Sequence, residues 1–225
     1  MTADRCDQPE DWLPYELAFV GGYCDAGSFV LTKTFTGHVT GNLVLASIAI
    51  AAHDWRSLLA HSSAIGAFLF ATVLSMLVMR RLHSWPSSRM LASAMFIEAI
   101  LIASASLMTT LDTIPRFELF LVLMSFGLGL QNGAFTRAGG IGIHTTYITG
   151  VITSLLSAET KATVAETLTP AMTKRDPDLG LLGRIWITFA LGAGSGAAMV
   201  SHFKSHGLLG ATVLLGLFSL VEVQQ

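Results

Sequence analysis

The segment that decides the fold reads Phe35-Thr36-Gly37-His38-Val39-Thr40-Gly41-Asn42. An edited copy returns in the second half of the chain as His144-Thr145-Thr146-Tyr147-Ile148-Thr149-Gly150-Val151. The two copies share a kernel, which we define as a β-branched residue followed by Thr and Gly. Each kernel stands between a Gly-rich apolar segment and another apolar run. The sequence therefore predicts two related halves, each organised around one kernel.

The composition indicates an integral membrane protein. Of the 225 residues, 52% are hydrophobic and only 12% are charged, and the mean hydropathy is +0.61. This leaves too little charge to cover the outside of a soluble globule, so the lipid bilayer is the expected partner. The formal net charge is −2, and the basic residues stand in short clusters. Nucleic acid is therefore excluded as a partner.

The apolar runs differ in length. Most are long enough to cross a bilayer, including residues 57–79 and 90–111. The run that follows the first kernel, residues 39–52, would form a helix of roughly 21 Å, which is short of the roughly 30 Å hydrocarbon core. A second short run, residues 147–158, includes the second kernel. The sequence thus predicts an all-α polytopic transmembrane helix bundle with about six spans and two short half-helices.

The distribution of Lys and Arg favours six spans over eight. If all runs cross, the two sides carry seven and six basic residues, which gives no orientation. If the two short runs enter without crossing, nine of the 13 collect on one side, and the positive-inside rule makes that side cytoplasmic. Both termini would then be cytoplasmic. Three spans in each half would insert the second half upside down, as an inverted 3+3 repeat in a single membrane domain of residues 1–225.

The two halves can be aligned along much of their length, with repeat 1 covering about 16–111 and repeat 2 about 117–223. Residues 126–135 can be laid over residues 19–26, which pairs Asn132 with Asp25. Two residues must then be inserted in the second half, and residues 137–140 are a natural place for them. Further along, Gly66-Ala67 corresponds to Gly192-Ala193.

The kernels predict a polar site at the ends of two short helices. A helix that begins inside a membrane protein presents free backbone N–H groups and the positive end of its dipole. Thr adds a hydroxyl group, and Gly allows close backbone approach. Such a site suits a small solute or ion near the bilayer midplane, and a transporter or channel is the predicted function. The predicted substrate-binding residues are Asp25, Thr40, Gly41, Asn42, Asn132, Thr149 and Gly150.

The same residues have a second interpretation. Thr and Gly also let helices pack tightly, and a non-transporting structural or assembly membrane protein would need them for packing alone. Asp25, an acid within an apolar run, favours function because such groups are costly inside a membrane. Glu98 raises the same question but has no counterpart in the second half. The Gly-rich faces could also pair two copies into a homodimer.

No pattern predicts an enzyme, a metal site or a cofactor. His38 and His144 precede the kernels at positions that do not match, which favours an interfacial location for both over metal binding. Cys24 is expected to pack as a small apolar side chain. Gly194-Ser195-Gly196 with His202 or His206 distantly resembles the Ser-His dyad of rhomboid proteases, but small-residue packing is the stronger interpretation, so an intramembrane hydrolase is not expected.

Several segments together resemble a known family. Residues 19–26, 35–42, 129–132 and 145–150 look like the hallmark segments of the YoaK-like bacterial membrane proteins, also called domain of unknown function 1275. The resemblance extends from about Leu17 to Leu220. It implies a bacterial inner-membrane location and about six transmembrane helices. It implies no biochemical activity, since the family is uncharacterised in function.

Overall fold

The computed structural model describes residues 12–82, 87–108, 112–134, 137–138, 141–142 and 179–224. Within these ranges the regular elements are helices and one minimal antiparallel ribbon, in which Arg137 pairs with Gly142 and Ala138 with Ile141. The elements are α1 (Leu13–Thr32), α2 (Val39–Ala51), α3 (Trp55–Arg81), α4 (Ser87–Ser106), α5 (Ile114–Ala134), β1 (Arg137–Ala138), β2 (Ile141–Gly142), α7 (Leu179–Phe203), the 3-10 helix η2 (Lys204–Leu208) and α8 (Leu209–Gln224). The ribbon lies where the alignment of the two halves requires an insertion.

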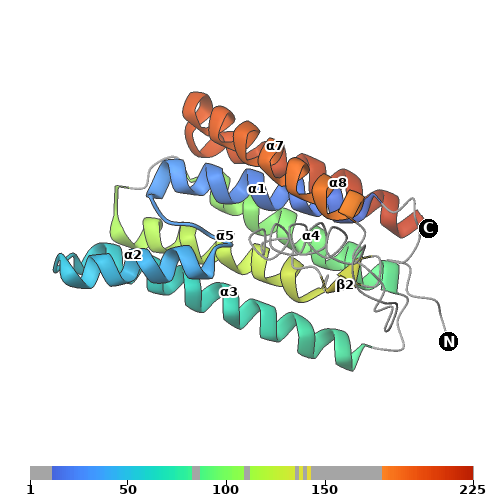
Figure 1. Ribbon diagram of the computed structural model, residues 1–225, viewed down its shortest axis with the longest axis horizontal. Helices are drawn as coiled ribbons and strands as arrows, with labels where there is room; N and C mark the ends of the chain where they lie inside the picture. Colours follow the sequence, from blue (N-terminus) through green and yellow to red (C-terminus); the bar gives the residue numbers. More distant parts are fainter. Residues whose placement is uncertain are drawn as a thin grey trace, which may run out of the picture.

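The long helices run back and forth along one axis of the molecule (Figure 1). The chain reverses between α7 and α8 at η2, where Lys204 has a φ of 52°. The start of α1 and the end of α8 lie at the same end of the bundle, on the right of the view (Figure 1).

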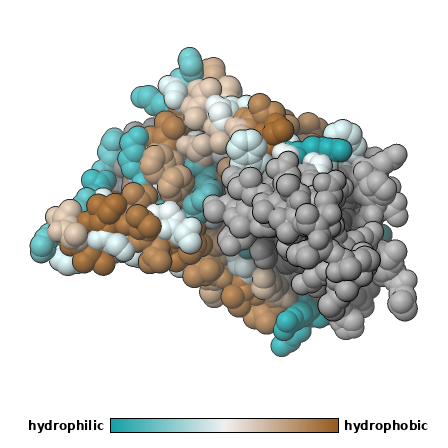
Figure 2. All heavy atoms as spheres, viewed as in Figure 1, coloured by the Kyte–Doolittle hydropathy of each residue, from teal (hydrophilic) through white to brown (hydrophobic). Residues whose placement is uncertain are grey.

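The outer surface of the helices is apolar, as expected for a helical membrane protein. Leu69, Phe70, Val73 and Leu77 of α3 are all exposed, and hydrophobic residues cover much of the surface formed by α2 and α3 (Figure 2). In the described part of the chain, four helical stretches are long and apolar enough to cross a membrane: Trp55–Arg81, Arg89–Ser106, Ile114–Ala134 and Gly180–Val221, the last containing both α7 and α8. Apolar side chains on this scale need lipid around them.

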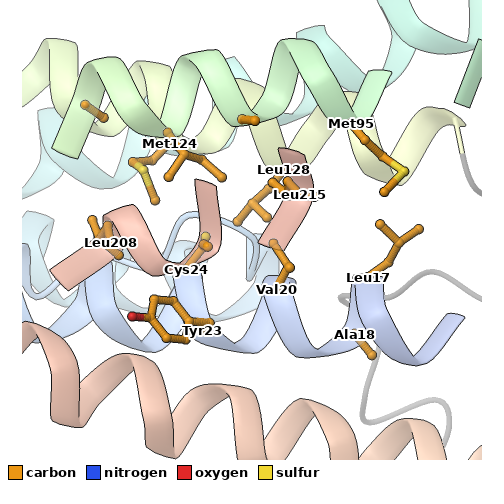
Figure 3. Packing of buried hydrophobic residues seen from close by; sticks show 14 of the residues in the cluster. Leu17, Ala18, Val20, Tyr23, Cys24, Met95, Met124, Leu128, Leu208 and Leu215 are labelled. Carbon is orange, nitrogen blue, oxygen red and sulfur yellow. The ribbon is translucent and has the colours of Figure 1, made fainter. Parts of the chain in front are cut away.

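The helices pack mainly in three pairs, α1 with α7, α3 with α5 and α4 with α8, and α5 also packs on α4. Between them lies one core of Leu, Met, Ala and Phe side chains. Figure 3 shows that Val20 and Cys24 point from α1 into this core, where Met124, Leu128 and Leu215 meet them. Cys24 is a buried free thiol, in agreement with the expectation from sequence.

Glycines bring the paired helices into direct backbone contact. A Cβ atom added at Gly22 of α1 would stand 2.2 Å from the carbonyl oxygen of Phe189 on α7. A Cβ atom at Gly129 of α5 would stand 2.4 Å from the carbonyl oxygen of Phe68 on α3. No side chain fits at these distances, so both helix pairs depend on glycine for their close approach.

The short helix α2 and the connection before it form a re-entrant segment. After α1, the chain folds back along the bundle, and α2 then returns to the end that α1 had reached, where α3 begins (Figure 1). One stripe of α2, consisting of Asn42, Ala46 and Ala49, is buried, and α2 packs on α3. The prediction of a short helix at residues 39–52 thus matches α2 closely.

Candidate functional site

The site begins with a sharp reversal at the end of α1. Lys33 adopts a left-handed conformation with a φ of 58°, and its N–H donates to the carbonyl oxygen of Phe29. This is the usual way to end a helix and turn the chain away from its axis. The next five residues, 34–38, can then run back beside the helix they have just left.

Asp25 holds this returning segment. This residue is 3% exposed and lies about two turns before the end of α1. The Oδ1 atom accepts hydrogen bonds from the backbone N–H of Thr36, at 2.7 Å, and of Gly37, at 2.8 Å. These N–H groups are buried, and each would cost about 1 to 3 kcal/mol if left without a partner. The carboxylate therefore fixes the course of the chain toward α2.

His38 covers the other carboxylate oxygen. Its Nδ1 atom contacts Oδ2 of Asp25, and 31% of its side chain is exposed. Phe35 and Phe189 flank the imidazole, with ring centroids 5.3 Å and 6.0 Å away. The hydrogen bond to Asp25 raises the pKa of His38, against the opposing effect of burial. A partly exposed imidazole thus stands between the buried carboxylate and the outside of the protein.

Asn42 secures the same segment from the side of α2. Its Oδ1 atom accepts the N–H of Phe35 at 3.0 Å, and its Nδ2 atom donates to the carbonyl oxygen of Phe35 at 2.6 Å. Because both polar groups of one residue are satisfied by one side chain, Phe35 is held in register with α2. The Phe35 ring stacks on Phe29 of α1, with centroids 4.4 Å apart.

Gly41 and Thr40 play different parts in the same turn. A Cβ atom at Gly41 would stand 3.1 Å from the Phe35 ring, so the glycine makes room for that ring. Thr40 is exposed. The structure thus brings Asp25, Gly41 and Asn42 together around residues 35–38 and leaves the Thr40 side chain on the surface of α2. In the described residues, no side chain caps the first turn of α2.

The remaining predicted site residues lie in the second half. Asn132 is buried on α5, 7% exposed, beside Gln131, whose Nε2 atom donates to the carbonyl oxygen of Leu17 on α1 at 3.0 Å. Thr149 and Gly150 lie outside the described residues, as does the whole second kernel. The described site therefore belongs to the first half.

The site combines three features that suit a small polar or charged ligand. It has a buried carboxylate, a partly exposed imidazole and a helix start whose N–H groups and dipole favour negative charge. Among the described residues, no group of three or more His, Cys, Asp and Glu side chains could hold a metal ion. What the geometry offers is hydrogen bonding and proton exchange at the Asp25–His38 pair.

Sequence reasoning did not assign His38 to this site. It expected an interfacial histidine because His38 and His144 do not occupy matching positions. A usable signal was present, since His38 belongs to the same eight-residue segment as Asn42. Of the residues that resemble a Ser-His dyad, Ser195 and His206 are exposed, and the ring of His202 contacts the carbonyl oxygen of Ala198.

Comparison with known proteins places this chain in a family. A family model described as "Protein of unknown function (DUF1275)" matches residues 13–221. The chain belongs to this family. Over 143 residues it is 27% identical to the UPF0700 transmembrane protein YoaK of Bacillus subtilis (strain 168), a match that covers 62% of this chain and 63% of that relative. The DUF1275 membership confirms the resemblance drawn from the sequence. No solved structure matches the chain.

Proposed function

We propose that this protein is a transporter or channel for a small solute or ion in the bacterial inner membrane, with its polar site at the start of α2. The observation that carries the proposal is the buried Asp25 carboxylate, which holds a re-entrant segment by the N–H groups of Thr36 and Gly37. Irregular backbone within a membrane is tolerated where it lines a cavity or is buried in protein, and transporters place such broken segments at their binding sites.

An inverted repeat of three plus three spans, with both termini cytoplasmic, belongs to the same proposal. The alignment that pairs Asp25 with Asn132 shifts the first half by 107 positions. The same shift pairs Gly22 with Gly129. Both glycines press against the carbonyl oxygen of a phenylalanine, Phe189 and Phe68 respectively. In the proposed repeat, α1 of the first half corresponds to α5 of the second, and α3 corresponds to α7. The contact of α1 with α7 then corresponds to the contact of α5 with α3, as an inverted repeat requires.

A second pair of contacts supports the same relation. A Cβ atom at Gly196 of α7 would meet the carbonyl oxygen of Tyr23 on α1, and Ser75 of α3 donates to the carbonyl oxygen of Leu130 on α5 at 3.0 Å. Tyr23 and Leu130 are again 107 positions apart. Gly196 and Ser75 are 121 apart, as are Phe189 and Phe68. This register differs from the sequence alignment of Gly66 with Gly192. A Cβ atom at Gly66 would meet nothing within 4 Å, whereas one at Gly192 would stand 2.1 Å from the carbonyl oxygen of Phe19.

The competing function is a structural or assembly role without transport. The observation that favours it is that both oxygens of Asp25 already have partners within the chain itself. Asp25 would then only fold the loop, and the glycines would only pack the helices. A homodimer fits either function and stays a prediction.

The two functions differ in whether water reaches the kernel. We would replace Cys6 and Cys24, introduce Thr40→Cys, and treat the protein in liposomes with a membrane-impermeant thiol reagent. Ala52→Cys, in the exposed connection after α2, serves as the reactive control, and Ser104→Cys, on the exposed apolar face of α4, as the lipid-facing control. Transport predicts that Thr40→Cys reacts as Ala52→Cys does. If it stays as unreactive as Ser104→Cys, the assembly role stands instead.

Permeability then tests the site directly. The swelling of proteoliposomes in solutions of urea, glycerol, formate or chloride would be followed by light scattering. We expect one of these probes to enter faster than into empty liposomes, and Thr40→Trp to remove the difference. Ser104→Trp, equally bulky but placed on α4, should leave it unchanged. If Thr40→Trp does not slow the entry of the probe, α2 does not line the pathway.

A further inference from the structure

A second acid lies deep in the bundle, apart from the site at α2. Glu98 of α4 is fully buried, with 0% of its surface exposed. Neither of its carboxyl oxygens has a hydrogen-bond partner among the described residues. The surrounding side chains on its own helix include Met95 and Ile102, both in the apolar core. Glu98 is therefore an acid enclosed by hydrocarbon.

The environment of Glu98 determines the state of its carboxyl group. An ionised carboxylate without a cation or hydrogen-bond donor is too costly to hold in an apolar interior, whereas a neutral acid costs only a few kcal/mol. Among the described residues, no hydrogen-bond donor reaches either oxygen of Glu98. In the closed bundle that the structure describes, Glu98 therefore carries its proton.

The chain makes specific room for this acid. A Cβ atom at Gly127 of α5 would stand 3.3 Å from Cγ of Glu98 and 3.8 Å from Cβ of Leu101, so glycine leaves the space that the Glu98 side chain occupies. The thiol of Cys24, which points from α1 into the same apolar core, interacts electrostatically with Glu98.

We propose that Glu98 is the proton-binding site of this protein, a carboxyl group that holds a proton in the closed bundle and releases it to water when the bundle opens. In the release step the O–H bond of Glu98 breaks, water takes the proton, and the carboxylate keeps the electron pair. The inference rests on the proposed transport function and gives it a coupling ion.

A proton fits Glu98 better than a metal cation does. A dehydrated cation needs several oxygen ligands at short distance, about six for Ca²⁺ or Mg²⁺. The described structure offers Glu98 no polar partner at all. A proton needs only the carboxyl group itself, and burial alone then ties its release to an opening of the helices.

The other titratable groups on the neighbouring elements are far from Glu98 or engaged elsewhere. Glu118 of α5 accepts a hydrogen bond from Ser63 of α3, and Arg116 lies about three turns of α5 from Gly127. Lys204 and His206 of η2 are exposed. Within the described part of the chain, the thiol of Cys24 interacts electrostatically with Glu98.

The test is infrared difference spectroscopy of the full chain in liposomes without any added solute. The spectrum of Glu98→Gln would be subtracted from that of the wild type, and Glu98→Met provides a second subtraction should Glu98→Gln fail to fold. We expect the carbonyl stretching band of a protonated carboxylic acid at neutral pH. The band should shift in D₂O, because the proton exchanges with water, and disappear reversibly in alkaline buffer. Asp25→Asn should leave it in place.

Each other result overturns the inference. If the wild type lacks the band, Glu98 is ionised and the burial argument is wrong. A band that persists in alkaline buffer and does not shift in D₂O belongs to a permanently protonated structural acid. The test also separates this inference from the transport function. If the band exchanges in D₂O but Thr40→Cys does not react with the thiol reagent, Glu98 is still a proton site, and the proposed pathway at α2 is wrong. A reactive Thr40→Cys with no band removes only the proton site.

Discussion

Oδ2 of Asp25 contacts Nδ1 of His38, so a residue at the start of α2 covers a carboxylate that belongs to the body of α1. The contact closes a loop of thirteen positions that reverses at Lys33. It also joins a buried group to a partly exposed one. Any change in the charge of the imidazole therefore acts on the docking of the loop itself.

We expect the docking of this loop to depend on pH. The pKa of His38 is raised, chiefly by its hydrogen bond to Asp25. The stabilisation by the charged imidazole is therefore complete below the ordinary histidine pKa of about 6.5 and is lost as the pH rises through the raised value. Proton titration of ¹³C-labelled histidine by NMR would measure this pKa.

Two variants control the titration. His38→Gln assigns the His38 signal, and Asp25→Asn should bring the pKa of His38 down toward the ordinary value, since the largest cause of its rise is removed. A His38 pKa that is the same with Asp25 and with Asn at position 25 would contradict the contact.

Asn42→Ala should destabilise the protein, whereas Thr40→Ala should not. Asn42 makes two hydrogen bonds to Phe35, and their loss should lower the free energy of unfolding by about 1 to 3 kcal/mol. Thr40 is exposed on the same helix, two residues away. Thermal unfolding in detergent would compare the two. Equal losses would mean that the Asn42 bonds do not hold the segment.

Gly196→Ala should disrupt the contact between α7 and α1. Its new methyl group would lie 2.2 Å from the carbonyl oxygen of Tyr23, and overpacking of this kind costs about 1 to 3 kcal/mol. Gly194→Ala is the matched control, because a Cβ at Gly194 meets nothing within 4 Å and alanine favours helix by about 1 kcal/mol. The melting temperature should fall in the first variant only.

The 3-10 helix η2 should act as a clamp between α1 and α4. Tyr23 donates its hydroxyl to the carbonyl oxygen of Gly207 at 2.6 Å, and Ser205 donates to that of Met108 at 2.6 Å. Tyr23→Phe and Ser205→Ala should each lower the free energy of unfolding by about 1 kcal/mol. Because the two bonds hold different neighbours, the double variant should lose the sum. A double variant no worse than either single one would contradict the clamp.

Much of this fold follows from patterns that the sequence displays. The length of the apolar run after the first kernel predicted that residues 39–52 would form a short helix, and α2 has these bounds to within one residue. The sequence also placed Asp25 inside an apolar run, and Asp25 is a buried residue of α1.

The partners themselves could not be predicted in the same way. His38 meets Asp25 because the chain reverses at Lys33, and a lysine in a left-handed conformation carries no sequence signal of the kind that glycine gives. The surroundings of similar glycines could not be predicted either. Gly66-Ala67 and Gly192-Ala193 look alike, but a Cβ atom at Gly192 would meet Phe19 whereas one at Gly66 would meet nothing within 4 Å.

The reversal at Lys33 also dictates an order of assembly. The re-entrant segment docks on Asp25, which belongs to α1, and α2 lies against α3. During synthesis, the returning segment can therefore dock as soon as α1 has formed, whereas α2 has no helix to pack on until α3 follows. A nascent chain halted before α3 emerges should accordingly already contain the contacts of Asp25 with Thr36 and Gly37, and lack the contacts between α2 and α3.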